Sequence, residues 1–131
     1  MATPQTRPSI GSIGWYDLTV PNAEEVHDFY SAVVGWATTP VDMGGYHDFC
    51  MNEPESGEAV AGICHSRGVN ADVPSQWLMY ITVANLEASL AQVAAHGGAV
   101  VREPKGGAQT GHYAIIRDPA GAVAMLFQPP D

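Results

Sequence analysis

The residues of this sequence with the clearest potential for chemistry are a carboxylate, a phenol and an imidazole. Asp17 follows Trp15 by two residues in the β-rich run I-G-W-Y-D-L-T-V (13–20). Because burying an unpaired carboxylate in a strand is costly, Asp17 is either a ligand or catalytic contact, or a structural residue that is hydrogen-bonded at a subunit interface or exposed. As a general base, Asp17 would need an acid, for which Tyr80 and His47 are the candidates.

Other reactive groups lack a recognisable motif. The two cysteines, Cys50 and Cys64, are expected to be buried free thiols, because no C-x-x-C or zinc-type Cys/His spacing occurs. The glycine-rich segment G-G-A-Q-T-G (106–111) does not match a phosphate-binding loop, and no G-x-S-x-G elbow is present. Phosphate-loop and serine-nucleophile chemistries are therefore excluded.

The charge balance restricts the partners. The 131 residues carry five Lys and Arg against 14 Asp and Glu, which gives a net charge of −9. No basic stripe is available for nucleic acid, and an anionic membrane surface is a poor match. No apolar stretch approaches the roughly 20 residues of a membrane span. The first nine residues lack the apolar core of a signal peptide, so we expect a disordered lead (1–9) and a cytoplasmic protein.

The sequence contains an internal repeat. The segment V-P-N-A-E-E (20–25) aligns with V-A-N-L-E-A (83–88), so that Val20 and Val83 lie 63 residues apart. The same offset relates Gly35 to Gly98. The second half of the chain is therefore predicted to be a diverged copy of the first.

The local signals predict the same series of elements in each half. Val26, Phe29, Tyr30 and Val33 have helical spacing and predict a helix over 23–34 with these four residues on its apolar face. Asn22 with Glu25, and later Asn85, are typical of helix N-caps. Strands are expected at 13–20, 38–41, 46–51, 59–65, 77–83, 100–103, 113–117 and 122–127, with loops at 52–58 and 105–111.

These elements predict an α+β fold built from two βαβββ modules. Module one is expected to cover 10–66 and module two 76–129, joined by a linker at 67–75 within a single domain of residues 10–131. Each module would form a four-stranded mixed sheet with one helix outside. The two helix-free faces would together form a curved trough, which is where we expect a ligand to bind.

Two longer motifs carry a resemblance to a known family. They are L-T-V-P-N-A-E-E-V-H-D-F-Y-S-A-V-V-G-W (18–36) and R-D-P-A-G-A-V-A-M-L-F (117–127). On these residues the chain resembles single-domain members of the vicinal oxygen chelate superfamily, the glyoxalase, bleomycin resistance protein and extradiol dioxygenase fold. The resemblance extends over nearly all of 10–129 and implies a homodimer with pockets at or near the subunit interface.

The resemblance also implies where metal ligands would lie. Metal-dependent members carry them at four positions that fall here on Trp15, Gly62, Leu78 and Met125. None of these side chains offers the nitrogen or oxygen donor that divalent metals need in this fold. We therefore expect no metal and no cofactor, which counts against a glyoxalase I or dioxygenase mechanism.

Strand alternation predicts which side chains line the trough instead. The expected ligand-binding residues combine apolar and aromatic groups with one acid: Trp15, Asp17, Val60, Gly62, Cys64, Leu78, Tyr80, Met125 and Phe127. Such a lining suits a planar or hydrophobic small molecule, including a cationic one.

Three functional hypotheses follow. The first is a metal-independent small-molecule-binding protein of the bleomycin resistance type. The second is a metal-free lyase or isomerase, with Asp17 as the base and Tyr80 or His47 as the acid. The third is a metal-dependent lyase or dioxygenase that holds its metal through unusual ligands such as Asp17, His47 and His112.

Overall fold

The computed structural model describes residues 8–131, so most of the expected lead at 1–9 lies outside the described residues. The chain divides into two compact units, one of Trp15–Leu78 and one of Met79–Asp131 together with the described residues before Trp15. Their elements follow in the order β1 (Ile13–Val20), α1 (Ala23–Val34), β2 (Ala37–Asp42), β3 (His47–Asn52), β4 (Ala59–His65), β5 (Trp77–Thr82), α2 (Leu86–Ala95), β6 (Ala99–Gly107), β7 (Gly111–Arg117) and β8 (Val123–Gln128). A short 3₁₀ turn, Gly68–Asn70, lies in the predicted linker.

The two modules have the same topology. In module one the strand order is β2-β3-β4-β1, and in module two it is β6-β7-β8-β5. The first strand of each module pairs in parallel with the last, and the other pairs are antiparallel. Asp17 pairs with Gly62, and Tyr80 pairs with Met125, so both partners are shifted by 63 residues. The repeat and the α+β fold predicted from the sequence are confirmed.

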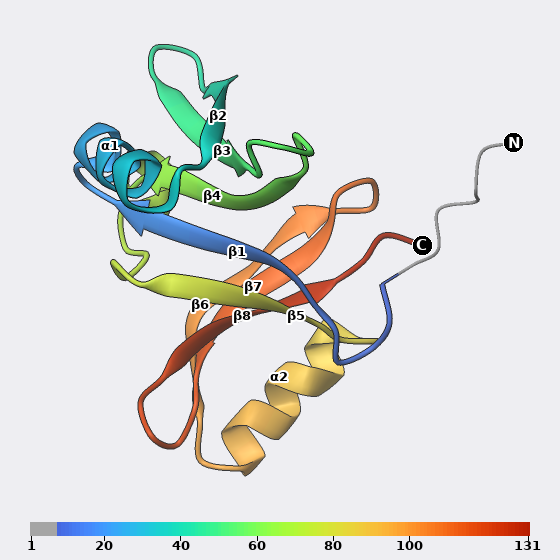
Figure 1. The fold of residues 1–131 in the computed structure, drawn as a ribbon. Helices are drawn as coiled ribbons and strands as arrows, with labels where there is room; N and C mark the ends of the chain where they lie inside the picture. The colour runs from blue at the N-terminus through green and yellow to red at the C-terminus, as the bar shows by residue number, and fades with distance from the viewer. Residues whose placement is uncertain (1–7) are drawn as a thin grey trace, which may run out of the picture. The chain divides into compact units, whose positions relative to one another are not determined.

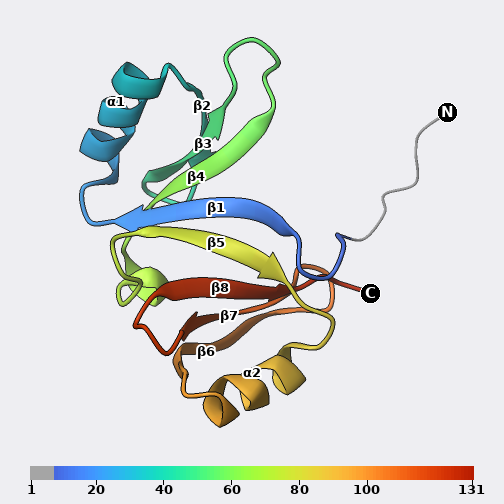
Figure 2. The ribbon, with the colours of Figure 1, turned by 60° about the horizontal axis from the view of Figure 1, so that its bottom comes forward.

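Each helix covers one face of its own strands (Figures 1 and 2). Helix α1 packs on a core of buried side chains from β1, β3 and β4: Leu18, Val20, Met51, Ala61 and Ile63. Helix α2 packs on the module-two core, in which Leu86, Ala114 and Leu126 are buried. Among residues 8–131, neither helix has the length and apolarity needed to cross a membrane.

The caps of the two helices differ. Asn85 forms the predicted N-cap of α2, because its side-chain oxygen accepts a hydrogen bond from the Ala88 amide at 2.9 Å. Asn22 does not cap α1 in this way, since its side-chain amide instead donates to the Glu25 carboxylate at 2.7 Å. Helix α1 ends as predicted at Gly35, which has a left-handed φ of 86°.

The buried face of α1 differs from the prediction. Phe29 and Val33 are 57% and 64% exposed, whereas Val26 and Tyr30 pack on the core. His27, which is outside the predicted apolar face, points inward, where its ring stacks on Phe49 at 4.3 Å and its Nε2 lies 2.6 Å from the Thr38 hydroxyl. The face of α1 that packs on the strands therefore carries Val26, His27 and Tyr30. His27 can lie on this face because its imidazole has a hydrogen-bond partner there.

The loop predicted at 105–111 is largely a hairpin. Strands β6 and β7 stay paired as far as Gly106 with His112 and Gly107 with Gly111, which leaves residues 108–110 as the turn. Gly106 makes this pairing possible, since its φ is 104° and a Cβ there would collide with the Gly111 carbonyl oxygen. The glycines from which a loop was predicted therefore allow strands β6 and β7 to lie close together.

Candidate functional site

The helix-free face of module one holds an oriented carboxylate. Asp17 and Trp15 lie on this side of β1, two residues apart, and both are half-buried. The indole Nε1 of Trp15 donates a hydrogen bond to the Asp17 Oδ1 at 2.7 Å. The carboxylate lies over Gly62, its partner on the neighbouring parallel strand β4. The Trp15 hydrogen bond therefore fixes the direction of the acid.

Gly62 leaves room for this carboxylate. A Cβ added at position 62 would collide with the Asp17 Oδ1 and would lie 3.6 Å from the Trp15 Nε1. The place that a side chain at position 62 would occupy is thus taken by Asp17. We call Trp15, Asp17 and Gly62 the Asp17 site.

A substitution at Gly62 tests this packing. In Gly62→Ala the Asp17 carboxylate has to rotate away from the Trp15 indole. We expect the free energy of unfolding, measured by urea denaturation, to fall by about 1–2 kcal/mol. Gly14→Ala is the matched control, since a Cβ at Gly14 in the same strand β1 meets nothing within 4 Å. Equal effects of the two substitutions would contradict the close packing of Asp17 over Gly62.

A partly buried polar cluster adjoins the Asp17 site. Burial, followed by the charges of Asp17 and Asp48, raises the pKa of the Cys64 thiol, which also hydrogen-bonds to Asp48. The buried Asp48 accepts a hydrogen bond from the His65 backbone amide at 2.9 Å and lies 3.1 Å from the His65 Nδ1. Cys64 is therefore a neutral thiol at neutral pH, as expected of an inert cysteine.

The sequence did not reveal the pairing of Asp48 with His65. Alternation along a single strand predicts the face on which a side chain lies, but not which residue of a neighbouring strand lies beside it. The signal that could have found it is the register of β3 on β4, where Phe49 pairs with Ile63. This register brings the residues before Phe49 beside those that follow Ile63.

The raised pKa of Cys64 predicts a pH dependence of stability. The unfolded thiol titrates near pH 8.5, whereas the folded thiol keeps its proton to higher pH. Its stabilising contribution is complete below about pH 8.5 and declines as the pH rises toward the folded-state pKa, by up to about 1.4 kcal/mol per pH unit. We expect Cys64→Ser to lack this decline between pH 8.5 and 10.5 in urea unfolding.

The control for this measurement is Cys50→Ser, which removes the other free thiol. We expect this variant to decline with pH as the wild-type protein does. The same slope in the wild-type and Cys64→Ser proteins would contradict a raised pKa of the Cys64 thiol in the folded protein.

On the helix-free face of module two, Tyr80 occupies the position that corresponds to Asp17 in module one. Tyr80 pairs with Met125 and Thr82 with Phe127. These side chains lie opposite the face that α2 covers, where the neighbouring Ile81 and Leu126 pack on the module-two core. Met125 is 5% exposed, and Leu78, on the same side of β5 as Tyr80, is 1% exposed. The structure therefore brings together Asp17, Trp15, Gly62 and Cys64 in module one, and Tyr80, Met125 and Phe127 in module two.

Val60 lies apart from the Asp17 site. The pairing of β3 with β4 shifts by one residue between Met51 and Asn52, which makes Val60 the extra residue of a β-bulge. The bulge interrupts the alternation used to assign Val60 to the face of Gly62. Val60 instead packs on the core beside α1 and lines an apolar hollow of about 300 Å³ with Tyr16, Trp36, Ala61 and Trp77.

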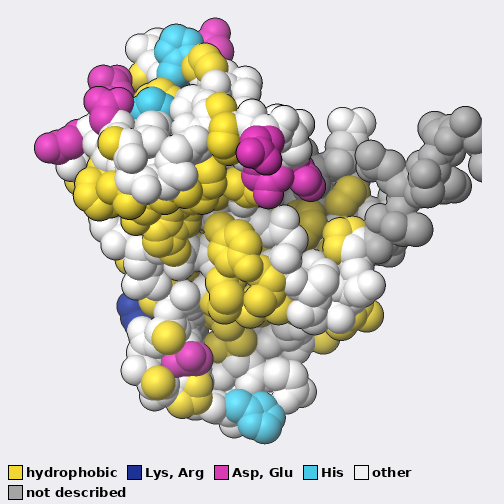
Figure 3. Space-filling model, in the orientation of Figure 1, with side chains coloured by type: hydrophobic (Ala, Val, Ile, Leu, Met, Phe, Trp, Pro, Cys, Tyr) yellow, Lys and Arg dark blue, Asp and Glu magenta, His cyan; other side chains and the backbone are white. Residues whose placement is uncertain are grey.

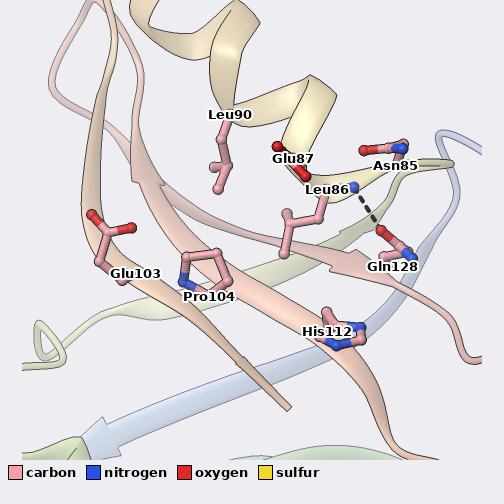
Figure 4. A pocket seen from close by; sticks show the side chains of 8 residues that line it. All are labelled: Asn85, Leu86, Glu87, Leu90, Glu103, Pro104, His112 and Gln128. Carbon is pink, nitrogen blue, oxygen red and sulfur yellow. Dashed lines mark hydrogen bonds between the residues drawn. The ribbon is translucent and has the colours of Figure 1, made fainter. Parts of the chain in front are cut away.

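Two of the predicted histidines lie on the helix side of the strands in their own modules. His47 is exposed at the start of β3, where alternation from the core residue Met51 places it on the helix side of the strands. His112 begins β7 and lines a hollow beside α2 (Figure 4). Neither histidine therefore lies on the helix-free face of its module.

The residues do not fit a metal. The four positions that the family resemblance implies hold Trp15, Gly62, Leu78 and Met125, and Asp17 fills the space that a ligand at position 62 would need. Among the described residues no three His, Cys, Asp or Glu side chains are grouped so that they could hold an ion. No step through a metal can be derived from this donor set.

Residues 12–126 match the family model described as Glyoxalase/Bleomycin resistance protein/Dioxygenase superfamily. Among curated proteins, "Putative glyoxylase CFP32" of Mycobacterium tuberculosis is 29% identical over 119 residues, covering 91% of this chain and 44% of the relative. "Anthracycline biosynthesis protein DnrV" of Streptomyces peucetius is 30% identical, covering 94% of this chain and 49% of the relative. The chain thus spans about half the length of the curated relatives it matches.

Solved structures show the same fold at low sequence identity. Methylmalonyl-CoA epimerase from Mycobacterium tuberculosis matches with a TM-score of 0.56 and 14% identity, over 98% of this chain and 95% of that one. The hypothetical protein BH1468 from Bacillus halodurans matches with a TM-score of 0.58 and 14% identity, over 92% and 96%. These likenesses concern the fold alone.

Proposed function

Because the chain belongs to the Glyoxalase/Bleomycin resistance protein/Dioxygenase superfamily, we propose that it binds a planar, aromatic small molecule at the Asp17 site without using a metal. The observation that carries this proposal is the carboxylate of Asp17, directed by the Trp15 indole and seated over Gly62. A fixed acid beside an indole ring suits a ligand that has both a flat apolar body and a positive charge.

Module two has its own helix-free face, which is apolar and aromatic. Tyr80, Met125 and Phe127 lie on this face and would supply apolar and aromatic contacts to a ligand bound there. Gly62 and Cys64 would line the floor around Asp17, and the thiol would stay neutral there. The homodimer implied by the family resemblance also remains a proposal.

Two further observations favour a cationic aromatic ligand. Acidic side chains spread over the molecular face of Figure 3 much more widely than basic ones, in keeping with the net charge of −9. Such a surface attracts cations from solution. The name of one relative refers to anthracycline biosynthesis, and anthracyclines are planar aromatic compounds.

The experiment that tests the proposal compares two tricyclic probes of opposite charge. The cation 9-aminoacridine and the anion anthracene-9-carboxylate are titrated into the protein by isothermal calorimetry in the presence of a chelator. We expect the cation to bind with at least tenfold lower Kd than the anion. Equal binding of the two probes, or binding of neither, would contradict the proposal.

A further inference from the structure

A hollow lies on the helix-covered side of module two, beside the start of α2. Its volume is about 570 Å³, within the range of small-molecule sites. Leu86 and Leu90 project from α2 toward the strands, Pro104 lies on β6, and His112 lies at the start of β7 (Figure 4). We call this hollow the α2 pocket. All of its lining residues belong to module two, whereas the Asp17 site belongs to module one.

The floor of the α2 pocket is apolar and well packed. Leu86 is buried in the module-two core with Ala114 and Leu126, and Leu90 packs against this core. His112 pairs across the hairpin with Gly106, so the paired residue has no side chain to cover the half-buried imidazole. The floor can therefore accept the apolar body of a ligand without rearrangement of the core.

The rim of the α2 pocket is acidic. Glu87 on α2 and Glu103 on β6 both line it, and among the described side chains neither forms an ion pair or a hydrogen bond. The basic residues of β6 lie on the other side of the strand, because Arg102 pairs with Ile115 and Lys105 with Tyr113. Directly paired residues share a face of a sheet, and Ile115 pairs in turn with Met125 on the helix-free face.

The free amides at a helix N-terminus can bind an anion, but the N-terminus of α2 does not offer such a site. The Leu86 amide already donates to the Gln128 Oε1 at 2.7 Å (Figure 4), and the Ala88 amide donates to the Asn85 Oδ1 at 2.9 Å. Two of the amides that a bound anion would use are thus occupied. The carboxylates beside them would further repel an anion.

From these features we infer that the α2 pocket binds an amphipathic organic amine. Its ammonium group meets the carboxylates of Glu87 and Glu103, and its apolar body lies on Leu86, Leu90 and Pro104. The imidazole of His112 borders the apolar body at the base of the pocket. This inference does not depend on the function proposed for the Asp17 site.

The test uses tryptamine as the probe and indole-3-propionate as its anionic counterpart. In two-dimensional NMR of the labelled protein, we expect tryptamine to shift the signals of Leu86, Leu90 and His112, and indole-3-propionate to leave them unchanged. Glu103→Gln should raise the Kd of tryptamine about fivefold. The matched control is Glu58→Gln, an exposed acid of module one, which should leave the Kd unchanged.

Three results would overturn the inference: absence of shifts at the pocket, equal binding of the anion, or the same loss of affinity in Glu58→Gln. The Kd is taken from the shifts of Leu86, Leu90 and His112 alone, so tryptamine bound at the Asp17 site does not enter the measurement. A failure at the α2 pocket is therefore distinguishable from a failure at the Asp17 site.

Discussion

Replacing Asp17 by Asn is expected to raise the Kd of 9-aminoacridine by about 10- to 100-fold. A hydrogen bond to a charged group contributes roughly 1.5–3 kcal/mol, and each 1.4 kcal/mol corresponds to a factor of ten in Kd. The amide oxygen of Asn can still accept the Trp15 hydrogen bond, so the fold of the Asp17 site should survive. Isothermal calorimetry measures the change in Kd, and circular dichroism checks the fold.

The control for Asp17→Asn is Asp72→Asn, which makes the same chemical change at an exposed position of the same unit. We expect its Kd for 9-aminoacridine to match that of the wild-type protein. The Kd of anthracene-9-carboxylate should not rise in Asp17→Asn, because the substitution removes a repulsive charge. An equal loss of affinity in both variants would show that the overall negative charge attracts the ligand, and it would contradict specific binding at the Asp17 site.

Replacing Gly106 by Ala is expected to lower the free energy of unfolding by about 2–4 kcal/mol. Gly106 has a φ of 104°, outside the regions that residues with a Cβ adopt readily. The new Cβ would also collide with the backbone carbonyl oxygen of Gly111, which cannot rotate away as a side chain would. Both effects separate the paired strands β6 and β7, so urea denaturation should show a large loss of stability.

Gly107→Ala is the neighbouring control. Gly107 has no positive φ, and a Cβ there meets nothing within 4 Å. We expect its free energy of unfolding to stay within about 0.5 kcal/mol of the wild-type value. If Gly106→Ala were as stable as Gly107→Ala, the close contact between Gly106 and the Gly111 carbonyl oxygen would be contradicted.

The repeat explains why so much of the fold is predictable from the sequence. A helix start after a strand appears twice at the same spacing, so each half supports the assignment of the other. The predicted bounds of β1, α1 and β4 agree with the structure. The pairings of Asp17 with Gly62 and of Tyr80 with Met125 confirm the offset of 63 residues.

The differences arise where side-chain pairing or an irregular backbone overrides periodicity. His27 turns inward because Phe49 and Thr38 offer it a stacking and a hydrogen-bonding partner. Val60 leaves the face of Gly62 because a β-bulge adds a residue to β4. Such features depend on contacts between distant segments, which the spacing of residues along one strand or helix does not encode.

The most direct test of the proposed function is the titration of 9-aminoacridine with and without divalent metal. The wild-type protein is titrated after exhaustive chelation, and again after separate addition of zinc, nickel, manganese or ferrous ions, with metal content determined by elemental mass spectrometry. We predict the same Kd in every sample and less than about 0.1 metal ion per chain, because the four positions implied by the family offer no nitrogen or oxygen side-chain donor. A stoichiometric metal ion, or binding that appears only when metal is added, would contradict metal-independent binding at the Asp17 site.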